Sequence, residues 1–163
     1  MRPFSEADIR ASFLNASLRE RKTLLLPDAL DQTPWDALDY LGWHDRKLPQ
    51  VAYVSVELDG APASLLLRRA DAKPRNRAQC SWCADVQLPN DVVLYTAKRA
   101  GDAGRRGDTV GVLVCENFEC SANVRKLPPS AYLGYDREAA RDRRIEQLTE
   151  NVTAFARAVR DGS

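Results

Sequence analysis

The sequence is short of several features that mark common classes of protein. Its 24 basic residues face 23 acidic ones, so no overall charge draws it to nucleic acid or to a membrane surface. No apolar run approaches the roughly 18 residues that a membrane-spanning helix requires, and the N-terminal stretch lacks the apolar core of a secretion signal. We therefore expect a cytoplasmic protein with no membrane partner.

Signs of catalysis are also scarce. The only histidine, His44, has no serine or cysteine beside it in the sequence, which is more typical of a surface or cap residue than of a catalyst. The stretch GDAGRRGD lacks the G-K-[ST] ending of a phosphate-binding loop and lies between predicted strands rather than before a helix. Carboxylates are scattered along the chain and none stands out. We expect a protein that is not an enzyme, with no catalytic residue and no small-molecule substrate.

What the sequence does contain is the pattern of a mixed α+β fold. A chain of 163 residues with 44% hydrophobic content suits one domain or two small ones. Helical spacing, N-cap residues and stop signals predict helices over 5–17, 33–42 and 136–160. Period-two alternation predicts strands over 51–58, 63–69, 91–99 and 109–115. The first two strands form a β-hairpin that turns at Asp59 and Gly60.

The cysteines are the most informative residues in the chain. They form a C-x2-C pair and a C-x4-C pair separated by 31 residues, and they are Cys80, Cys83, Cys115 and Cys120. Four thiolates complete the tetrahedral shell that Zn2+ prefers and leave no open position for a substrate, so the pattern predicts one structural zinc ion. Two alternatives are buried apolar cysteines and a thioredoxin-like redox pair. The segment after Cys83 is rich in turn residues, whereas a redox pair stands before a helix.

The order of elements around the cysteines narrows the set of folds that the sequence can adopt. The tight C-x2-C turn comes first, the two later strands form an antiparallel hairpin that returns Cys115 to it, and a short helix is predicted within 116–126. Cys120 lies in the first turn of that helix, where the helix dipole favours a thiolate. This is the order of a treble-clef zinc finger. We divide the chain into an N-terminal α/β region, 1–72, and a treble-clef zinc-binding domain with the long C-terminal helix, 73–163.

These motifs resemble those of the FusB-type elongation-factor-G-binding proteins, whose C-terminal domain is a treble-clef zinc finger. The likeness rests on the C-x2-C pair, the return strand GVLVCENFEC and the VRK after it, and on MRPFSEADIRASF and PWDALDYLGWHD, which look like the shorter chromosomal members. It implies that the four cysteines match the zinc ligands of the family. It also implies binding to elongation factor G and, in the better-known members, release of that factor from ribosomes stalled by fusidic acid. Those resistance proteins carry a larger N-terminal helical bundle, so we expect binding to the factor and leave drug protection open.

The resemblance places the contact surface of such proteins on the zinc-binding domain, around the metal. The equivalents here are one aromatic residue inside each cysteine pair and the cations of the hairpin, namely Trp82, Phe118, Lys98, Arg99, Arg105 and Arg106. Aromatic residues and arginines commonly anchor interfaces. Two alternatives stay open, in which the aromatic pair forms an apolar lid on the zinc and the arginines form a solvated loop face.

A second functional hypothesis is a zinc-dependent protein that binds RNA or the ribosome. Two basic stretches, 68–77 and 98–106, would supply phosphate contacts, and Trp82, Tyr95 and Phe118 would supply stacking surfaces. Binding of this kind weakens steeply with ionic strength, which separates the two hypotheses.

Overall fold

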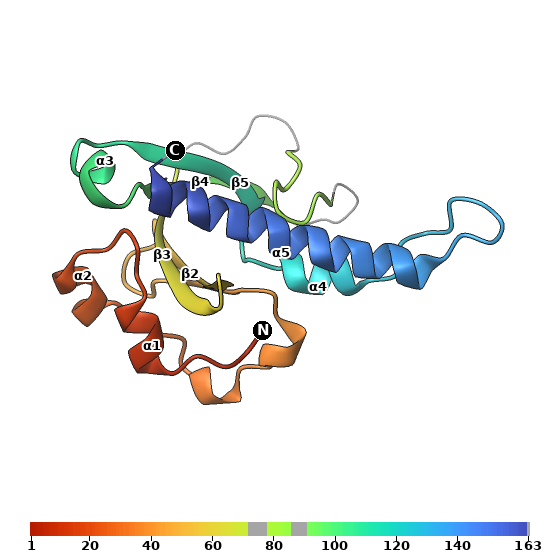
Figure 1. The fold of residues 1–163 in the computed structure, drawn as a ribbon, viewed down its shortest axis with the longest axis horizontal. Coiled ribbons are helices and arrows are strands. Elements are labelled where there is room, and N and C mark those ends of the chain that lie inside the picture. Colours follow the sequence, from red (N-terminus) through yellow and green to blue (C-terminus); the bar gives the residue numbers. More distant parts are fainter. Residues whose placement is uncertain (72–77, 86–90, 163) are drawn as a thin grey trace.

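The computed structural model describes residues 1–71, 78–85 and 91–162, and its centre is a five-stranded antiparallel sheet in the order β1-β2-β3-β4-β5 (Figure 1). The strands are β1 (Leu41–His44), β2 (Val51–Leu58), β3 (Ala61–Arg69), β4 (Val92–Lys98) and β5 (Thr109–Cys115). The helices are α1 (Glu6–Ala11), α2 (Leu18–Thr23), α3 (Gly101–Arg105), α4 (Cys120–Arg125) and α5 (Arg137–Asp161). Among the residues described, no helix is both long and apolar enough to cross a membrane.

Two apolar cores lie on opposite faces of the sheet, because successive residues of a strand point to opposite sides. On one face, Val54 and Leu65 belong to a core that α5 closes with Val152. On the other face, Tyr53 and Leu66 pack with the N-terminal segment that carries α1 and α2. Since both faces are covered, β2 is a nearly continuous buried run instead of an alternating one.

The first core draws residues from both of the predicted regions of the chain, and β3 pairs directly with β4. The predicted boundary between these regions, at 72 and 73, lies outside the described residues. The division into two domains therefore stays a prediction.

The predicted helix over 5–17 begins as expected and ends early. A capping box at Ser5 starts α1, which is six residues long. The chain then becomes extended, because the N–H of Ser64 in β3 donates to the carbonyl of Ser12 and the N–H of Leu14 donates to the carbonyl of Ser64. A tertiary interaction with β3 thus replaces the second half of the predicted helix, and α2 follows as a helix that was not predicted.

The predicted helix over 33–42 is wrong. Only Trp35–Ala37 forms a single 3-10 turn, and Leu41–His44 is strand β1. Leu41 and Trp43 are buried and alternate with more exposed neighbours, which is the period of a strand. The Thr-Pro pair before them resembles a helix start, and the prediction followed that signal instead of the alternation.

The other predicted elements are confirmed by the structure. The hairpin of β2 and β3 turns at Asp59 and Gly60, whose φ angles of 52° and 80° suit a type I′ turn. The second hairpin, the short helix after the cysteines and the long C-terminal helix are all present as β4 with β5, α4 and α5. The glycine-rich loop of the second hairpin contains α3, which was not predicted.

Candidate metal centre

The four cysteines meet at one buried point. Their sulfur atoms all lie within 4.8 Å of one another, and none is in a disulfide. The Sγ atoms of Cys80 and Cys120 are 3.6 Å apart, and those of Cys83 and Cys115 are 3.7 Å apart. A tetrahedral zinc site with Zn–S bonds of about 2.3 Å has sulfur–sulfur edges of about 3.8 Å. The thiols are therefore spaced as the ligands of one zinc ion.

The first pair lies in a tight turn, which we call the knuckle. The backbone N–H of Cys83 donates to the Sγ of Cys80 over 3.5 Å, and the N–H of Ala84 donates to the Cys80 carbonyl over 2.9 Å. Ala84 closes the turn with a left-handed φ of 54°, a conformation that an L-residue rarely adopts. The N–H of Ser81 donates to the carbonyl of Leu113 over 2.7 Å and so fastens the knuckle to β5.

The second pair is held by the end of a strand and the start of a helix. Cys115 is the last residue of β5, and Cys120 is the first residue of α4. Between them, the N–H of Phe118 donates to the Cys115 carbonyl over 3.0 Å. The side-chain amide of Asn123 lies 3.7 Å from the Sγ of Cys115 and 4.0 Å from that of Cys83. Such outer contacts orient metal ligands, and an N–H donor favours the thiolate.

The only histidine supports the loop between the second pair of cysteines. The Nε2 of His44 lies 2.9 Å from the carbonyl oxygen of Glu116, and the hydroxyl of Tyr95 donates to the same oxygen over 3.0 Å. The carboxylate of Glu116 forms an ion pair with Arg69. Contacts from β1, β3 and β4 thus converge on this loop and fix the position of its cysteines.

Trp82 and Phe118 are buried beside the thiols, with 1% and 8% of their surfaces exposed. The Trp82 ring packs edge-on against Tyr40 and Phe155, at centroid distances of 5.0 Å and 5.8 Å. The Phe118 ring stacks on Tyr95 at 5.3 Å. Of the two roles left open for this pair, the burial favours the apolar lid. Direct contact with a partner would need the core to open, and it stays a prediction.

The surroundings of the thiols also suit a zinc-bound tetrathiolate. The buried hydroxyl of Tyr40 has no hydrogen-bond partner among the described residues. Burial raises the pKa of Tyr40, and the adjacent Cys120 raises it further, so this hydroxyl keeps its proton. A thiolate at Cys120 would give it an acceptor. The residues present therefore fit zinc, since four soft ligands are accompanied by polar hydrogens from Tyr40 and Asn123.

The predicted cationic contacts lie at the far end of the β4–β5 hairpin. The pairing of these strands runs from Val92 opposite Cys115, beside the metal, to Lys98 opposite Thr109. That length of strand corresponds to about 20 Å at 3.4 Å per residue. The other basic stretch, 68–77, lies for the most part outside the described residues. The hairpin cations are therefore not next to the metal.

Three of these cations form a surface of their own, which we call the hairpin end. Lys98, Arg105 and Arg106 are exposed there. The guanidinium of Arg99 instead donates to the carbonyl of Ala158 in α5 over 2.6 Å. The structure thus separates the cationic residues from the two aromatic residues with which they were grouped, and their contact with a partner stays a prediction.

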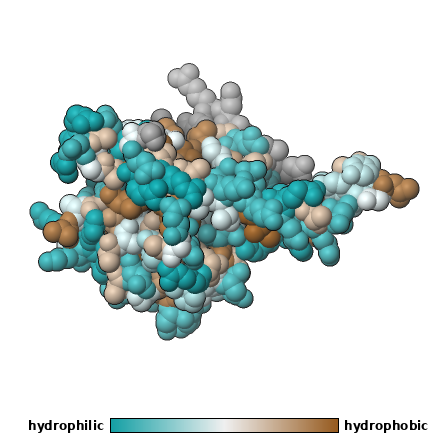
Figure 2. Space-filling model, in the orientation of Figure 1, coloured by the Kyte–Doolittle hydropathy of each residue, from teal (hydrophilic) through white to brown (hydrophobic). Residues whose placement is uncertain are grey.

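An exposed apolar loop lies between α4 and α5 and was not predicted from the sequence; we call it the tip loop (127–135). The side chain of Leu133 is fully exposed at 103%, Tyr132 is 66% exposed, and the Tyr132 and Tyr135 rings meet at 5.2 Å. The loop projects at the opposite end of the molecule from α3 (Figure 1), and Figure 2 shows apolar surface at the end of this arm. The available signal was the string AYLGY in a turn-rich segment between two predicted helices.

A family model described as the FBP C-terminal treble-clef zinc-finger matches residues 8–159. The chain belongs to this family. The knuckle, the β4–β5 hairpin and α4 surround the four cysteines in the order of a treble clef, which confirms the predicted fold and the single structural zinc. Four sulfur ligands close the coordination shell, so the metal of a family member of this kind stabilises the fold and offers no open position.

Among solved structures, the fold is similar to that of the protein described as the fusidic acid resistance protein FusC, with a TM-score of 0.60 and 18% identity. The likeness covers 93% of this chain and 58% of that one, so the chain spans little more than half the length of FusC. At this identity the likeness shows the fold alone. No curated protein matches the sequence.

Replacement of Cys115 by serine should release the zinc and unfold the zinc-binding half, because the free energy of binding a structural metal is part of the folding free energy. Elemental analysis should find about one zinc per chain in the unmodified protein and far less in the variant. Circular dichroism would follow the loss of structure. A Cys115→Ser protein that kept both its zinc and its fold would show that the ligand set is wrong.

Asn123→Leu should weaken zinc binding by about 10- to 100-fold, because the leucine keeps the buried volume and removes the N–H donor from two ligand sulfurs. Competition with a chromogenic chelator measures the affinity. Asn117→Leu is the control, since Asn117 is exposed in the same region and contacts Glu119 instead of a sulfur. Equal loss of affinity in both variants would count against a role for the Asn123 amide.

Trp82→Ala should lower the free energy of unfolding by about 3–5 kcal/mol, the usual cost of truncating a buried aromatic ring. Phe118→Leu is a milder test of the same lid and should cost less. Urea unfolding followed by fluorescence or circular dichroism measures both. If neither change altered stability, the two rings would not be a lid.

Proposed function

We propose that this protein is a non-enzymatic zinc protein of the cytoplasm that binds elongation factor G and modulates its release from the ribosome. The observation that carries the proposal is the family match over residues 8–159. The likeness in fold to FusC, a fusidic acid resistance protein, supports it. A closed zinc site agrees with a binding role, because such a metal stiffens the surface around it without taking part in a reaction.

Protection of translation from fusidic acid is a separate step of the proposal. It would follow if binding drew the factor off a stalled ribosome. The chain matches 58% of the length of FusC, so factor binding and drug protection need separate measurements.

Two exposed surfaces carry residue types that bind proteins. The tip loop presents Tyr132 and Leu133 to solvent, and docking would remove their apolar area from water. The hairpin end presents cations, which act mainly on the rate and specificity of association. We propose the tip loop as the apolar anchor for the factor, in place of the two buried aromatic residues beside the zinc.

The RNA-binding alternative receives less support from the arrangement of the aromatic residues. Trp82, Tyr95 and Phe118 would have to stack on bases, and all three are buried. Binding to RNA through stacking needs exposed rings. We therefore prefer the protein partner.

Calorimetric titration with purified elongation factor G tests the proposal. We expect a dissociation constant of about 10 μM or tighter. A single-stranded RNA serves as the parallel ligand, and its binding, if any, should weaken much more steeply with salt than binding of the factor. An absence of binding to the factor at this concentration would reject the proposal.

Leu133→Ser should weaken binding of the factor about tenfold or more if the tip loop is the anchor, because interface anchors contribute at least about 1.4 kcal/mol each. Leu18→Ser is the matched control, since Leu18 is also largely exposed, at 74%, but lies in the N-terminal segment. Equal affinities for both variants and the unmodified protein would place the interface elsewhere.

A further inference from the structure

A pocket lies where β3 and β4 separate. The two strands pair only at Arg68 opposite Thr96 and at Arg69 opposite Tyr95. Beyond that point the N-terminal segment takes over as the neighbour of β3, through its bridge between Phe13 and Ser64. The sheet therefore forks, and the pocket occupies the fork with a volume of about 530 Å³.

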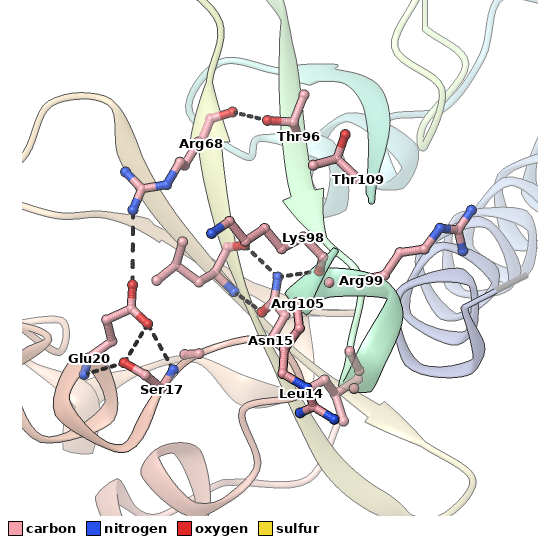
Figure 3. Close-up of a pocket in the computed structure, with 15 residues that line it drawn as sticks. Leu14, Asn15, Ser17, Glu20, Arg68, Thr96, Lys98, Arg99, Arg105 and Thr109 are labelled. Carbon is pink, nitrogen blue, oxygen red and sulfur yellow. Dashed lines mark hydrogen bonds and ion pairs between the residues drawn. The ribbon is translucent and has the colours of Figure 1, made fainter. Parts of the chain in front are cut away.

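Asn15 closes the floor of this fork. Its amide nitrogen donates to the carbonyls of Leu66 in β3 and Lys98 in β4, over 2.9 Å and 3.0 Å, and its oxygen accepts from the N–H of Leu66 over 2.8 Å (Figure 3). One side chain thus satisfies backbone groups that a continuous ladder would have paired. The pocket above it is a built feature of the fold and not a gap between mobile loops.

Cations dominate the walls of the pocket. Arg68 comes from β3, Lys98 from β4 and Arg105 from α3, whereas the Arg99 side chain turns away toward α5 (Figure 3). Of the described residues that line the pocket, Glu20 alone is acidic. Hydroxyl groups of Ser17, Thr96 and Thr109 complete the polar part of the lining.

Neighbouring acidic groups neutralise the charges of these cations to different extents. Arg105 pairs with Asp102 outside the pocket, and Arg68 lies 4.0 Å from the Glu20 carboxylate. Within the described part of the chain, no hydrogen bond or ion pair reaches the ammonium group of Lys98. The lining therefore keeps a surplus of positive charge centred on Lys98.

Glu20 is ionised at neutral pH and faces the same space. Burial would raise the pKa of this carboxyl, but hydrogen bonds from Ser17 and the charges of Arg68 and Lys98 outweigh it and lower the pKa. Glu20 also accepts from the Ser17 backbone and hydroxyl in the capping box of α2. Glu20 partly offsets the charge of Arg68 and opposes any anion that enters.

We propose that this pocket binds a phosphate group of its ligand, with Lys98 as the central contact and Arg68 and Arg105 at its sides. A phosphate group holds four oxygens around a tetrahedral phosphorus, of which three are unesterified in a monoester and two in a backbone diester. Because they point to different sides, they suit donors that come from β3, β4 and α3 at once. A carboxylate offers two oxygens in one plane and would use fewer of them. The phosphate belongs either to a free phosphorylated compound or to the backbone of an RNA strand.

Nuclear magnetic resonance of the uniformly 15N-labelled protein tests the site with two probes, inorganic pyrophosphate and a twelve-residue uridine oligonucleotide. We expect both to shift the amide signals of Asn15, Thr96, Lys98 and Thr109. Tighter binding of pyrophosphate would assign the site to free phosphorylated compounds. Tighter binding of the oligonucleotide, with displacement by pyrophosphate, would assign it to the RNA backbone.

Three single-charge variants sharpen the test. Lys98→Gln should lower the affinity for both probes about tenfold, the loss expected for one charge-assisted contact. Glu20→Gln can keep the capping hydrogen bonds of α2. Because it removes the charge that opposes an anion, it should raise the affinity for both probes a few-fold. Arg143→Gln removes a charge from an exposed position on α5 outside the pocket and should change the affinities little.

The proposal would be overturned if neither probe moved the pocket amides at millimolar concentration. It would also be overturned if Arg143→Gln and Lys98→Gln weakened binding equally, which would indicate attraction to the overall charge. A hexaglutamate peptide that shifted the same amides as strongly as pyrophosphate would reject phosphate as the preferred group. None of these outcomes depends on binding to elongation factor G, which is measured separately.

Discussion

Four sulfur atoms around one zinc ion join three parts of the chain that are distant in the sequence, namely the knuckle, the end of β5 and the start of α4. The side-chain amide of Asn123 in α4 reaches the same three parts, through the sulfurs of Cys83 and Cys115. Helix α5 then clamps the knuckle from outside, because Asn151 donates to the Trp82 carbonyl over 2.9 Å and Arg144 pairs with Asp85 at 2.8 Å. The metal and the long helix therefore stabilise the same turn, and the Trp82 ring packs against Phe155 of that helix.

The N-terminal segment covers the second face of the sheet. Few of its residues lie in helices of its own. Short α1 and α2 each begin at a capping box, and between them the chain lies along β3 as an extra neighbour. Asn15 allows this change of neighbour, since it pairs the backbone groups left at the fork. The N-terminal part and the zinc-binding part are linked by the pairing of β3 with β4, by the bond from the Asn15 amide to the Lys98 carbonyl, and by a shared core.

The features predicted from sequence are those fixed by local rules. The cysteine spacing, the left-handed turn at Asp59 and Gly60, and the apolar stripe of α5 each specify one arrangement. Strand β1 was missed because four residues are too few for periodicity to outweigh a helix-start signal. The fork at Asn15 and the separation of the cations from the zinc depend on where distant segments meet, and a single sequence carries no direct record of that.

Helix α5 begins immediately after the tip loop, and its last turn contacts the hairpin, where the N–H of Ala100 donates to the carbonyl of Val159 over 2.8 Å. A straight helix of 25 residues is about 37 Å long at 1.5 Å per residue. The helix therefore keeps the tip loop and the hairpin end at a fixed distance from each other. A partner that engages both ends must span that distance, which excludes an extended peptide of fewer than about ten residues.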